Sequence, residues 1–437
     1  MSEEKAPRHI EVEVTGKHYR PLEGQWQAEG VVIIDGETAP FAARKTDGNW
    51  LIEIKMKTKN AQAEQKARKI VEKALSEERR FISFDSSGRR KKVTRRIASE
   101  KVTEEIKLAH GGGGTLMFHL LSEIVIPNIK NPTVERLDDS AEINIQSSRI
   151  AFTTDSFVVR PLFFPGGDIG RLAVSGTVND ICCLGAKPLA LSLSFIFEEG
   201  FPISDLKAIL KSITQTAKEA NVKIVTGDTK VVEKGAADKL FINTAGIGQI
   251  PEGVNLSSHN VRAEDSVILT GTVGDHGATV VSLQRGLKLK TSLRSDTAPL
   301  NRIVEKLLQK FPNKVHCIKD PTRGGVAAAL NEISENSNVA IEIDENAIPT
   351  QPEVLGICEL LGLDPLSVAN EGKLLIFIEQ DAAEEALSLI RRQKYGSNAA
   401  IIGKTIESDV PVVTMRTSIG GTRIIDMPYG EQLPRIC

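Results

Sequence analysis

The fold is decided near the middle of the chain by Leu189-Ala-Leu-Ser-Leu-Ser-Phe-Ile-Phe197 and by the segment Ser204-Asp-Leu-Lys-Ala-Ile-Leu-Lys-Ser-Ile213 that follows it. The first is an apolar run of strand length and predicts a buried strand. In the second, apolar residues recur at helical spacing, and Ser204 is placed to cap the helix. Apolar segments over 222–225 and 241–247 predict further strands, so this region alternates strands with a helix.

The same pattern extends outward on both sides. Residues 151–154 predict an earlier strand, and a second unit starts near Val261, with strands predicted over 267–270, 339–343 and 374–378 and helical segments between them. The two halves are alike in layout but share no clear sequence repeat. We therefore expect an α+β region of two domains. Their expected bounds are 104–258 and 259–437.

Residues 1–103 differ from the rest in composition. Both tryptophans lie there, and the segment through Lys107 has 23 basic against 18 acidic side chains, whereas the remainder is net acidic. Strand-like segments lie at 10–14, 31–34 and 50–54, and a helix is predicted over 60–77. We expect a separate small domain, an antiparallel sheet with one helix. Its closing basic run is either a solvated linker or a contact for an acidic partner.

Bulk composition excludes several classes of protein. The formal net charge is -2 over 437 residues, which gives no general attraction to nucleic acid or to a membrane. No stretch approaches the roughly 20 apolar residues of a membrane span, and none resembles a signal peptide. The 5 cysteines are too scattered for a disulfide framework or a zinc site. The expectation is a cytoplasmic protein with reduced thiols.

Two glycine-rich segments are candidates for phosphate binding. The run Gly111, Gly112, Gly113, Gly114 precedes a helix-like segment, and Gly271-Thr-Val-Gly-Asp-His-Gly277 follows a predicted strand. A glycine loop before a helix presents backbone N–H groups that favour anions. Neither is a P-loop, since no Gly-Lys-Ser/Thr follows. A flexible turn is the equal alternative for either loop alone.

Acidic residues beside Gly, Pro or Thr at predicted element ends form a stronger signal. They are Asp138, Asp155, Asp180, Asp228 and Asp320. Any one of them is typical of a cap or turn residue. Several together indicate carboxylates that converge on Mg²⁺ and nucleotide phosphates, because Mg²⁺ takes oxygen ligands.

The chain ends in the tail Met427-Pro-Tyr-Gly-Glu-Gln-Leu-Pro-Arg-Ile-Cys437. Its prolines and glycine argue against a helix. Eleven residues at about 3.3 Å each could reach roughly 35 Å. A thiol on such an end can carry an acyl or carbamoyl group into an active site and out again; an ordinary free cysteine is the alternative.

Eight motifs occur in an order that resembles one family. They are Ala109-His-Gly-Gly-Gly-Gly114, Phe152-Thr-Thr-Asp-Ser-Phe-Val-Val159, Pro161-Leu-Phe-Phe-Pro-Gly-Gly-Asp-Ile-Gly170, Asn179-Asp180, Gly227-Asp-Thr-Lys230, Gly274-Asp-His-Gly277, Asp320-Pro-Thr-Arg-Gly-Gly325 and Pro434-Arg-Ile-Cys437. Together they resemble the HypE family of hydrogenase maturation proteins, the carbamoyl dehydratases, within the aminoimidazole ribonucleotide synthetase-like ATP enzymes. The resemblance covers about Ile106 to Cys437. Residues 1–103 have no counterpart, and Cys182-Cys183 replaces apolar residues.

The resemblance implies a two-domain fold with ATP between the halves of each chain and a homodimer that pairs strands of the first domain. It implies that a separate carbamoyltransferase loads Cys437 with a carbamoyl group, which ATP-dependent dehydration converts to a thiocyanate. The cyano group would then pass to an iron-carrying hydrogenase maturation scaffold. The tail must leave the site for that delivery, so it should be mobile.

The matched motifs and the acidic residues named above give the expected site residues. For ATP they are Gly111, Gly112, Gly113, Gly114, Asp155, Asn179, Asp228, Gly274, Asp275 and Arg323; for Mg²⁺ they are Asp138, Asp155, Asp180 and Asp320. We expect Lys230 and Glu371 to handle protons near the carbamoyl nitrogen, because burial can move either pKa toward neutrality. A surface ion pair is the alternative for both. Beside Cys437, we expect the end carboxylate to disfavour the thiolate and Arg435 to offset it in part.

Two other functions remain open at this point. A sister ATP enzyme, of the selenophosphate synthetase or thiamine-phosphate kinase type, would phosphorylate a small molecule, but the cysteine tail would then have no purpose. A non-catalytic maturation scaffold would not need the acidic and lysine residues. The role of residues 1–103, the hydrogenase served and the part played by Cys182 and Cys183 are not determined by the sequence.

Overall fold

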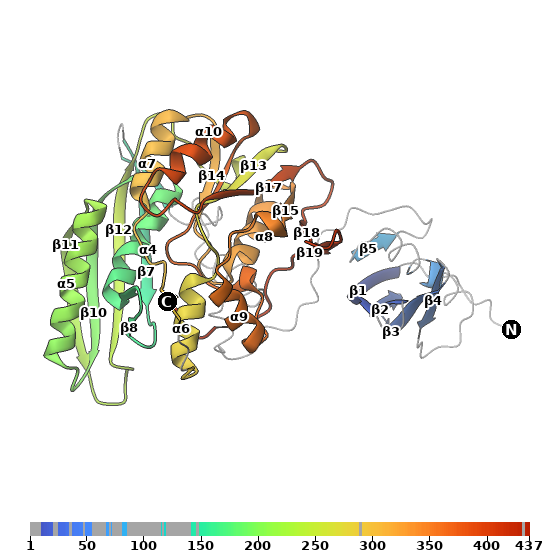
Figure 1. Ribbon diagram of the computed structural model, residues 1–437, viewed down its shortest axis with the longest axis horizontal. Helices are drawn as coiled ribbons and strands as arrows, with labels where there is room; N and C mark the ends of the chain where they lie inside the picture. Colours follow the sequence, from blue (N-terminus) through green and yellow to red (C-terminus); the bar gives the residue numbers. More distant parts are fainter. Residues whose placement is uncertain are drawn as a thin grey trace. The chain divides into compact units, whose positions relative to one another are not determined.

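The computed structural model describes residues 148–287, 291–430 and 433–437 continuously. Before them it describes the strands up to β6 given below and the single helical positions 67–69, 71, 115 and 118. The chain divides into two compact units, 1–103 and 104–437 (Figure 1). The boundary agrees with the change in composition at residue 103.

The first unit contains a five-stranded antiparallel sheet in the order β4-β3-β2-β1-β5. Its strands are β1 (Ile10–Arg20), β2 (Gln25–Ile34), β3 (Glu37–Thr46), β4 (Asn49–Ile54) and β5 (Phe81–Phe84). Phe41 and Ile54 are buried, as are Ala67 and Val71 of the helical positions. The predicted antiparallel sheet is therefore present. Most of the helix predicted over 60–77, and the basic run after it, lie outside the described residues.

The larger unit begins with a five-stranded sheet in the order β11-β10-β12-β7-β6. Its strands are β6 (Ala141–Ile145), β7 (Ser148–Phe157), β10 (Lys187–Glu198), β11 (Lys223–Val232) and β12 (Leu240–Ile250). The helices α4 (Ile169–Cys183) and α5 (Ile203–Ala220) pack on one face, after a small hairpin of β8 (Phe163–Phe164) and β9 (Gly167–Asp168). The strand and helix predicted from 189–213 are thus confirmed.

Two details of that central stretch differ from expectation. Pro202, and not Ser204, is the N-cap of α5, and no side chain caps the helix. β10 is not buried on both sides, because Leu191 and Phe195 face the helices whereas Ile196 is 42% exposed. The sheet therefore has one covered and one open face, which the apolar run alone could not indicate.

The second half carries a seven-stranded sheet in the order β14-β16-β13-β17-β15-β18-β19. Its strands are β13 (Asp265–Leu269), β14 (Val315–Lys319), β15 (Ala340–Asp344), β16 (Leu375–Glu379), β17 (Ala400–Ile406), β18 (Val413–Arg416) and β19 (Thr422–Ile424). Its helices are α6 (Asp275–Gln284), α7 (Asn301–Lys310), α8 (Gly325–Ser337), α9 (Pro352–Leu361) and α10 (Gln380–Arg391), with short 3₁₀ turns at Ser258–Asn260, Glu345–Ala347 and Pro365–Ser367. One apolar core runs from α4 of the first half into this half.

Asn179 helps to join the halves. Its side-chain amide donates to the Ala298 carbonyl at 3.1 Å, and its Oδ1 accepts from the Leu300 N–H at 2.9 Å. The residue is 2% exposed. Arg171 adds a second tie, because its Nε donates to the Thr297 carbonyl at 2.8 Å. These bonds fix the loop over 295–300 against α4. No helix in the described part of the chain is long and apolar enough to cross a membrane.

Candidate functional site

The C-terminal tail lies docked between the two halves, and it brings Cys437 beside Arg323. The Cys437 Sγ is 3.6 Å from Nη1 of Arg323. Arg323 immediately precedes Gly324, the left-handed N-cap of α8. Ile436 is 3% and Leu433 8% exposed, so the tail's apolar side chains belong to the core. The end of the tail is therefore a built part of the structure.

Every carbonyl from Pro434 to Cys437 accepts a hydrogen bond. From the first half, the Val158 N–H donates to Cys437 O at 3.0 Å and the Arg160 N–H to Arg435 O at 3.2 Å. From α6 in the second half, Gln284 Nε2 donates to Pro434 O and Arg435 O, and His276 Nε2 lies 2.7 Å from Ile436 O. The docked tail thus bonds to both halves at once.

The Arg435 side chain points away from the thiol. It forms an ion pair with Asp238, donates from Nε to Val158 O at 3.0 Å and lies over the Phe241 ring at 5.7 Å. The expectation that Arg435 offsets the charge beside Cys437 is therefore wrong, and Arg323 takes that place. Arg435 instead fastens the tail to the first half.

Burial dominates the chemistry of the Cys437 thiol. It raises the pKa of the thiol to about 12, with Arg323 acting to lower it and the acids Glu371 and Asp155 acting to raise it. The docked thiol is therefore protonated at neutral pH, and it is a poor nucleophile in this position. A reaction of this sulfur as a thiolate would need another position of the tail.

Three carboxyl groups meet near this thiol. Asp155 lies on β7 on the face covered by α4, where a Cβ at Gly176 would come within 3.4 Å of its Oδ2. Burial raises the pKa of Asp155 despite the nearby Arg323. Burial, and then the charges of Asp155 and Asp320, raise the pKa of Glu371 well above its ordinary value. The site therefore concentrates negative charge around one arginine.

Glu371 lies on a loop whose backbone is bound by the side chain of Asp296. The two oxygens of Asp296 accept from the backbone N–H groups of Glu371 and Gly372, at 3.1 Å each. Lys373 Nζ bonds to Asp296 at 2.9 Å and lies 3.6 Å from Asp275. Burial would raise the pKa of Asp296, but Lys373 holds it below its ordinary value, so this carboxylate stays ionised.

Asn370 connects the same loop to the two motif loops around it. Its Oδ1 accepts from the Gly274 N–H at 2.8 Å, and its Nδ2 donates to the Pro321 carbonyl at 2.9 Å. The segments that start α6, precede α8 and carry Glu371 therefore form one rigid group. The segments around Gly274, Asp320 and Glu371 are far apart in the sequence, and the fold brings them together.

Other predicted residues are placed elsewhere or used internally. The side-chain amide of Asn179 is engaged in its hydrogen bonds to the backbone of Ala298 and Leu300. Asp275 is 3% exposed and accepts from Gln351 Nε2 at 2.9 Å, and burial raises its pKa to about 6. Asp180 accepts from Thr153 Oγ1 at 2.9 Å on the α4 side of β7. Gly111 to Gly114 and Asp138 lie outside the described residues.

Asp228 and Lys230 are not brought to the thiol within the chain. They lie on the edge strand β11, 3.4 Å from each other and both largely exposed. Register places Lys230 beside Ile196 on the open face of the sheet, whereas Asp155 faces α4. β11 and β7 are three strand spacings apart, about 14 Å. In one chain this pair matches the surface ion pair that was the alternative.

The residues near Cys437 fit Mg²⁺ only together with phosphate. Within the described residues no three His, Cys, Asp or Glu side chains are grouped to hold a metal ion by themselves. Glu371 Oε1 is buried and has no hydrogen-bond partner among the residues that the structure describes, and the charges of Asp155 and Asp320 act on it. Mg²⁺ commonly binds through one or two carboxylates plus substrate phosphates and water. The donor set therefore suits a magnesium ion that arrives with a nucleotide.

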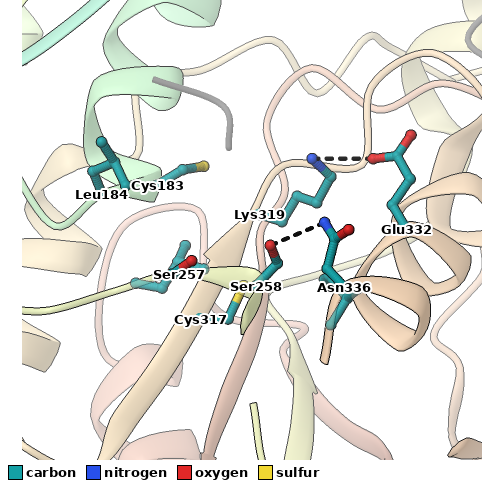
Figure 2. Close-up of a pocket in the computed structure, with 10 residues that line it drawn as sticks. Cys183, Leu184, Ser257, Ser258, Cys317, Lys319, Glu332 and Asn336 are labelled. Atoms are coloured by element: carbon teal, nitrogen blue, oxygen red, sulfur yellow. Dashed lines mark hydrogen bonds and ion pairs between the residues drawn. The ribbon is translucent and has the colours of Figure 1, made fainter. Parts of the chain in front are cut away.

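A small pocket lies near the acidic residue Asp320 (Figure 2). Cys183 lines it, and the Cys183 Sγ is 3.8 Å from Asp320 Oδ1. Figure 2 shows Lys319 paired with Glu332 at 3.2 Å on the opposite wall, and Asn336 bonded to Ser258 at 3.1 Å. The polar groups drawn thus bond mainly to one another, so the pocket is better explained as a packing gap than as a substrate site.

Sequence reasoning missed the supporting residues. His276 and Lys373 are 0% and 7% exposed, and Lys373 bonds to Asp296 at 2.9 Å. His276 lies in the segment Gly274-Asp-His-Gly277, and this glycine-rich segment is its local signal in the sequence. Asp296 and Lys373 lie in ordinary sequence and become significant only through long-range contacts.

Comparison with known proteins identifies the architecture. Residues 137–250 match the N-terminal domain, and residues 262–416 the C-terminal domain, of AIR synthase related proteins. A carbamoyl dehydratase HypE of Bradyrhizobium diazoefficiens is 49% identical over 332 residues, which cover 76% of this chain and 96% of the relative.

Solved structures agree with the sequence comparison. A crystal structure of a HypE-HypF complex matches with a TM-score of 0.67 at 48% identity, covering 71% of this chain and 99% of the other. Hydrogenase maturation protein HypE in complex with ATP matches with a TM-score of 0.64 at 43% identity, covering 76% and 100%. Residues 1–103 lie before both matched family domains.

Proposed function

The chain belongs to the HypE family of carbamoyl dehydratases, and from that premise we propose that it dehydrates a carbamoyl group with ATP during hydrogenase maturation. The relatives are named for this activity, and one is a complex with ATP. We propose further that the carbamoyl group is carried on Cys437. The observation that supports this most directly is the docking of the Cys437 thiol beside Arg323 and the acids.

The reaction balances in two steps. The oxygen of the Cys437 thiocarbamate takes the γ-phosphoryl group of ATP and the nitrogen loses one proton, which gives ADP and an O-phosphorylated imidate. The nitrogen then loses its second proton while the C–O bond breaks, which gives a thiocyanate and inorganic phosphate. Phosphorylation converts a poor leaving group into a good one, and positioning with charge stabilisation supplies most of the catalysis.

The residues around the thiol suit these steps. Arg323 stays positively charged because Cys437 and Asp155 raise its pKa further, so it can hold the carbamoyl oxygen and offset the incoming negative charge. Glu371 is the candidate proton acceptor for the carbamoyl nitrogen, since a carboxylate with a raised pKa is a stronger base. Asp155, Asp180 and Asp320 are the candidates to hold Mg²⁺, which would neutralise phosphate charge when bound.

We propose two protein partners for the tail. A carbamoyltransferase of the HypF kind would load Cys437, in keeping with the HypE-HypF complex of a relative. Because the docked thiol is protonated, the tail must undock for loading, and we retain the prediction that it is mobile. An iron-carrying scaffold would then accept the cyano group. The five free cysteines suit the reducing cytoplasm.

We also propose a homodimer through the open face of the first sheet. Ile196 and Ile247 are 42% and 38% exposed on that face, and Val231 on the edge strand is 68% exposed. An exposed apolar sheet face with an unpaired edge is an interaction surface. A partner subunit packed there would lie near the Asp228 and Lys230 pair. These two residues do not reach the thiol of their own chain, and in the dimer they would contribute to the site of the partner subunit.

Mass spectrometry of the C-terminal peptide tests the proposed function. The protein is incubated with a HypF-type carbamoyltransferase, carbamoyl phosphate and ATP. We expect an adduct on Cys437 of the natural protein that is lighter by one water than a carbamoyl group, and an intact carbamoyl adduct on Cys437 of Glu371→Gln. Cys437→Ala should abolish both while ATP binding persists. A modification on Cys182, Cys183, Cys317 or Cys358 would contradict the carrier role, and transfer of phosphate to an added small molecule would favour the sister kinases.

A further inference from the structure

We propose that His276 is the positioning residue that sets the register of the docked tail, by holding the carbonyl of the penultimate residue Ile436 and thereby placing the Cys437 sulfur beside Arg323. The proposal rests on the proposed function of Cys437 as the carrier. His276 does not contact the reacting atoms; it acts through the tail backbone.

The direction of the hydrogen bond follows from the ring environment. Burial lowers the pKa of His276, whose side chain is fully buried, so the imidazole is neutral and has one N–H. The Ile436 carbonyl can only accept, so the proton is on Nε2, which lies 2.7 Å from it. Nδ1 must then accept, and the Ser295 hydroxyl, 2.7 Å away, is its donor.

Surrounding groups fix the ring in that orientation. The Ser295 Oγ accepts from the Thr297 N–H at 3.1 Å and lies 2.7 Å from the Thr297 hydroxyl. Phe164 packs edge-to-face on the imidazole, with ring centroids 5.4 Å apart. With the tail docked, the tautomer and the ring plane are therefore both determined, and Nε2–H is the donor to the tail.

The position of the Nε2–H donor determines the register of the tail. Ile436 O lies one residue before the thiol-bearing residue, so a shift of the tail by one residue would present the wrong carbonyl. The Cys437 carbonyl accepts from the Val158 N–H of the first half, and the Arg435 carbonyl accepts both from the Arg160 N–H of the first half and from Gln284 of α6. His276 adds the contact to the carbonyl between them, and with Gln284 it registers the same segment against the second half, which carries Arg323 and Glu371.

The same support also holds the proton acceptor. Ser295 orients His276, and its neighbour Asp296 holds the backbone N–H groups of Glu371 and Gly372. A single short segment thus places the carrier thiol from one side and the Glu371 loop from the other.

Alkylation of Cys437 in full-length protein without ATP measures the docking directly. Iodoacetamide should react slowly with the docked, protonated thiol and faster with an undocked tail, and mass spectrometry of the C-terminal peptide reports the rate. His276→Phe keeps an aromatic ring and removes the donor, so we expect the alkylation rate to rise about tenfold, as the loss of one buried hydrogen bond implies. His276→Gln keeps an N–H donor and should stay within about twofold of the natural protein.

A matched control separates positioning from stability. His316 is also buried, and it bonds to Asp265 at 2.7 Å on β14, away from the tail. His316→Phe should lower the thermal midpoint and leave the alkylation rate unchanged. If His276→Phe does not fold, Ser295→Ala, which removes the hydroxyl that fixes the tautomer, should raise the rate in the same direction.

Single-turnover dehydration of the carbamoylated protein provides the second measurement. His276→Phe should slow it about tenfold at unchanged ATP affinity, and His276→Gln should restore it. A folded His276→Phe protein with natural alkylation rate overturns the proposal. Failure of the proposed function is a different result, since the natural protein would then show no dehydration while the alkylation rates still reported the docking.

Discussion

At the scale of single residues, the site places the carboxyl groups of Asp155, Asp320 and Glu371 around one arginine, Arg323. After burial, the charges of Asp155 and Asp320 raise the pKa of Glu371, and Arg323 acts to lower it. Burial of like charges is costly, so such a group is kept for chemistry more often than for stability. The thiol placed beside Arg323 is what distinguishes this site from a simple nucleotide pocket.

Glu371→Gln tests the proton acceptor. The variant keeps the size of the side chain but cannot take a proton, so we expect single-turnover dehydration to fall by at least about 100-fold. ATP binding should stay near its natural value by calorimetry. As control, Glu379→Gln alters a partly exposed carboxylate paired with Lys314 and should change neither quantity.

The same residue sets an expected pH dependence. A base acts only when ionised, and the pKa of Glu371 is raised, so the dehydration rate should fall as pH drops through that raised value. In Glu371→Gln the residual rate should lose this acidic limb. A full rate in the variant, or an unchanged limb, would remove Glu371 from the mechanism.

At the scale of elements, the start of α6 is the point where loop, tail and core meet. A Cβ at Gly277 would come within 2.4 Å of Val368 and 3.1 Å of Leu433 in the tail. The Gly277 N–H also donates to the Ala369 carbonyl at 3.0 Å. The second glycine loop of the sequence is therefore needed for close packing against the tail and the Glu371 loop.

Gly277→Ala should consequently destabilise the protein by about 1–3 kcal/mol, as overpacking of a filled core does. Denaturant unfolding measures this, and Cys437 alkylation should rise in the same variant because Leu433 is displaced. Gly356→Ala in α9 is the matched control, since nothing lies within 4 Å of its added Cβ and alanine favours a helix. Equal stability of the two variants would contradict the packing argument.

Prediction from sequence succeeded where a local signal existed. Strand periodicity located β7, β10 and β12 within a few residues, and local motifs marked the strand β7, which carries Asp155, and the loop that carries Asp320. Prediction failed where the role of a residue depends on contacts with residues far away in the sequence. The cap at Pro202, the internal use of Asp275 and the placement of Lys230 on the open face follow from packing and strand register, which no local window contains.

At the scale of the whole molecule, the larger unit has the extent of its relatives, and residues 1–103 add a sheet of their own. Nothing in the matched domains assigns that sheet a role. The open face of the first sheet in the larger unit is the feature that points beyond a single chain, because apolar side chains lie there among polar ones.

Ile196→Asp tests the proposed dimer. A closed two-fold interface repeats each contact, so one buried charge enters it twice. We expect the natural protein to sediment as a dimer at micromolar concentration and the variant as a monomer of unchanged secondary structure. Leu360→Asp on α9, where the leucine is 62% exposed, is the control and should remain dimeric. A natural protein that sediments as a monomer would exclude this interface at that concentration.

The buried position of the tail also bears on how the protein survives oxidants. Peroxide attacks a thiolate and not a thiol, and the pKa of docked Cys437 is about 12. While docked, the Cys437 sulfur is therefore kept from the irreversible sulfinic and sulfonic states. In the proposed cycle, exposure to oxidative damage would be confined to the interval when the tail is undocked for loading or delivery. The burial that would make the thiol depend on another enzyme for its carbamoyl group would thus also protect it between reaction cycles.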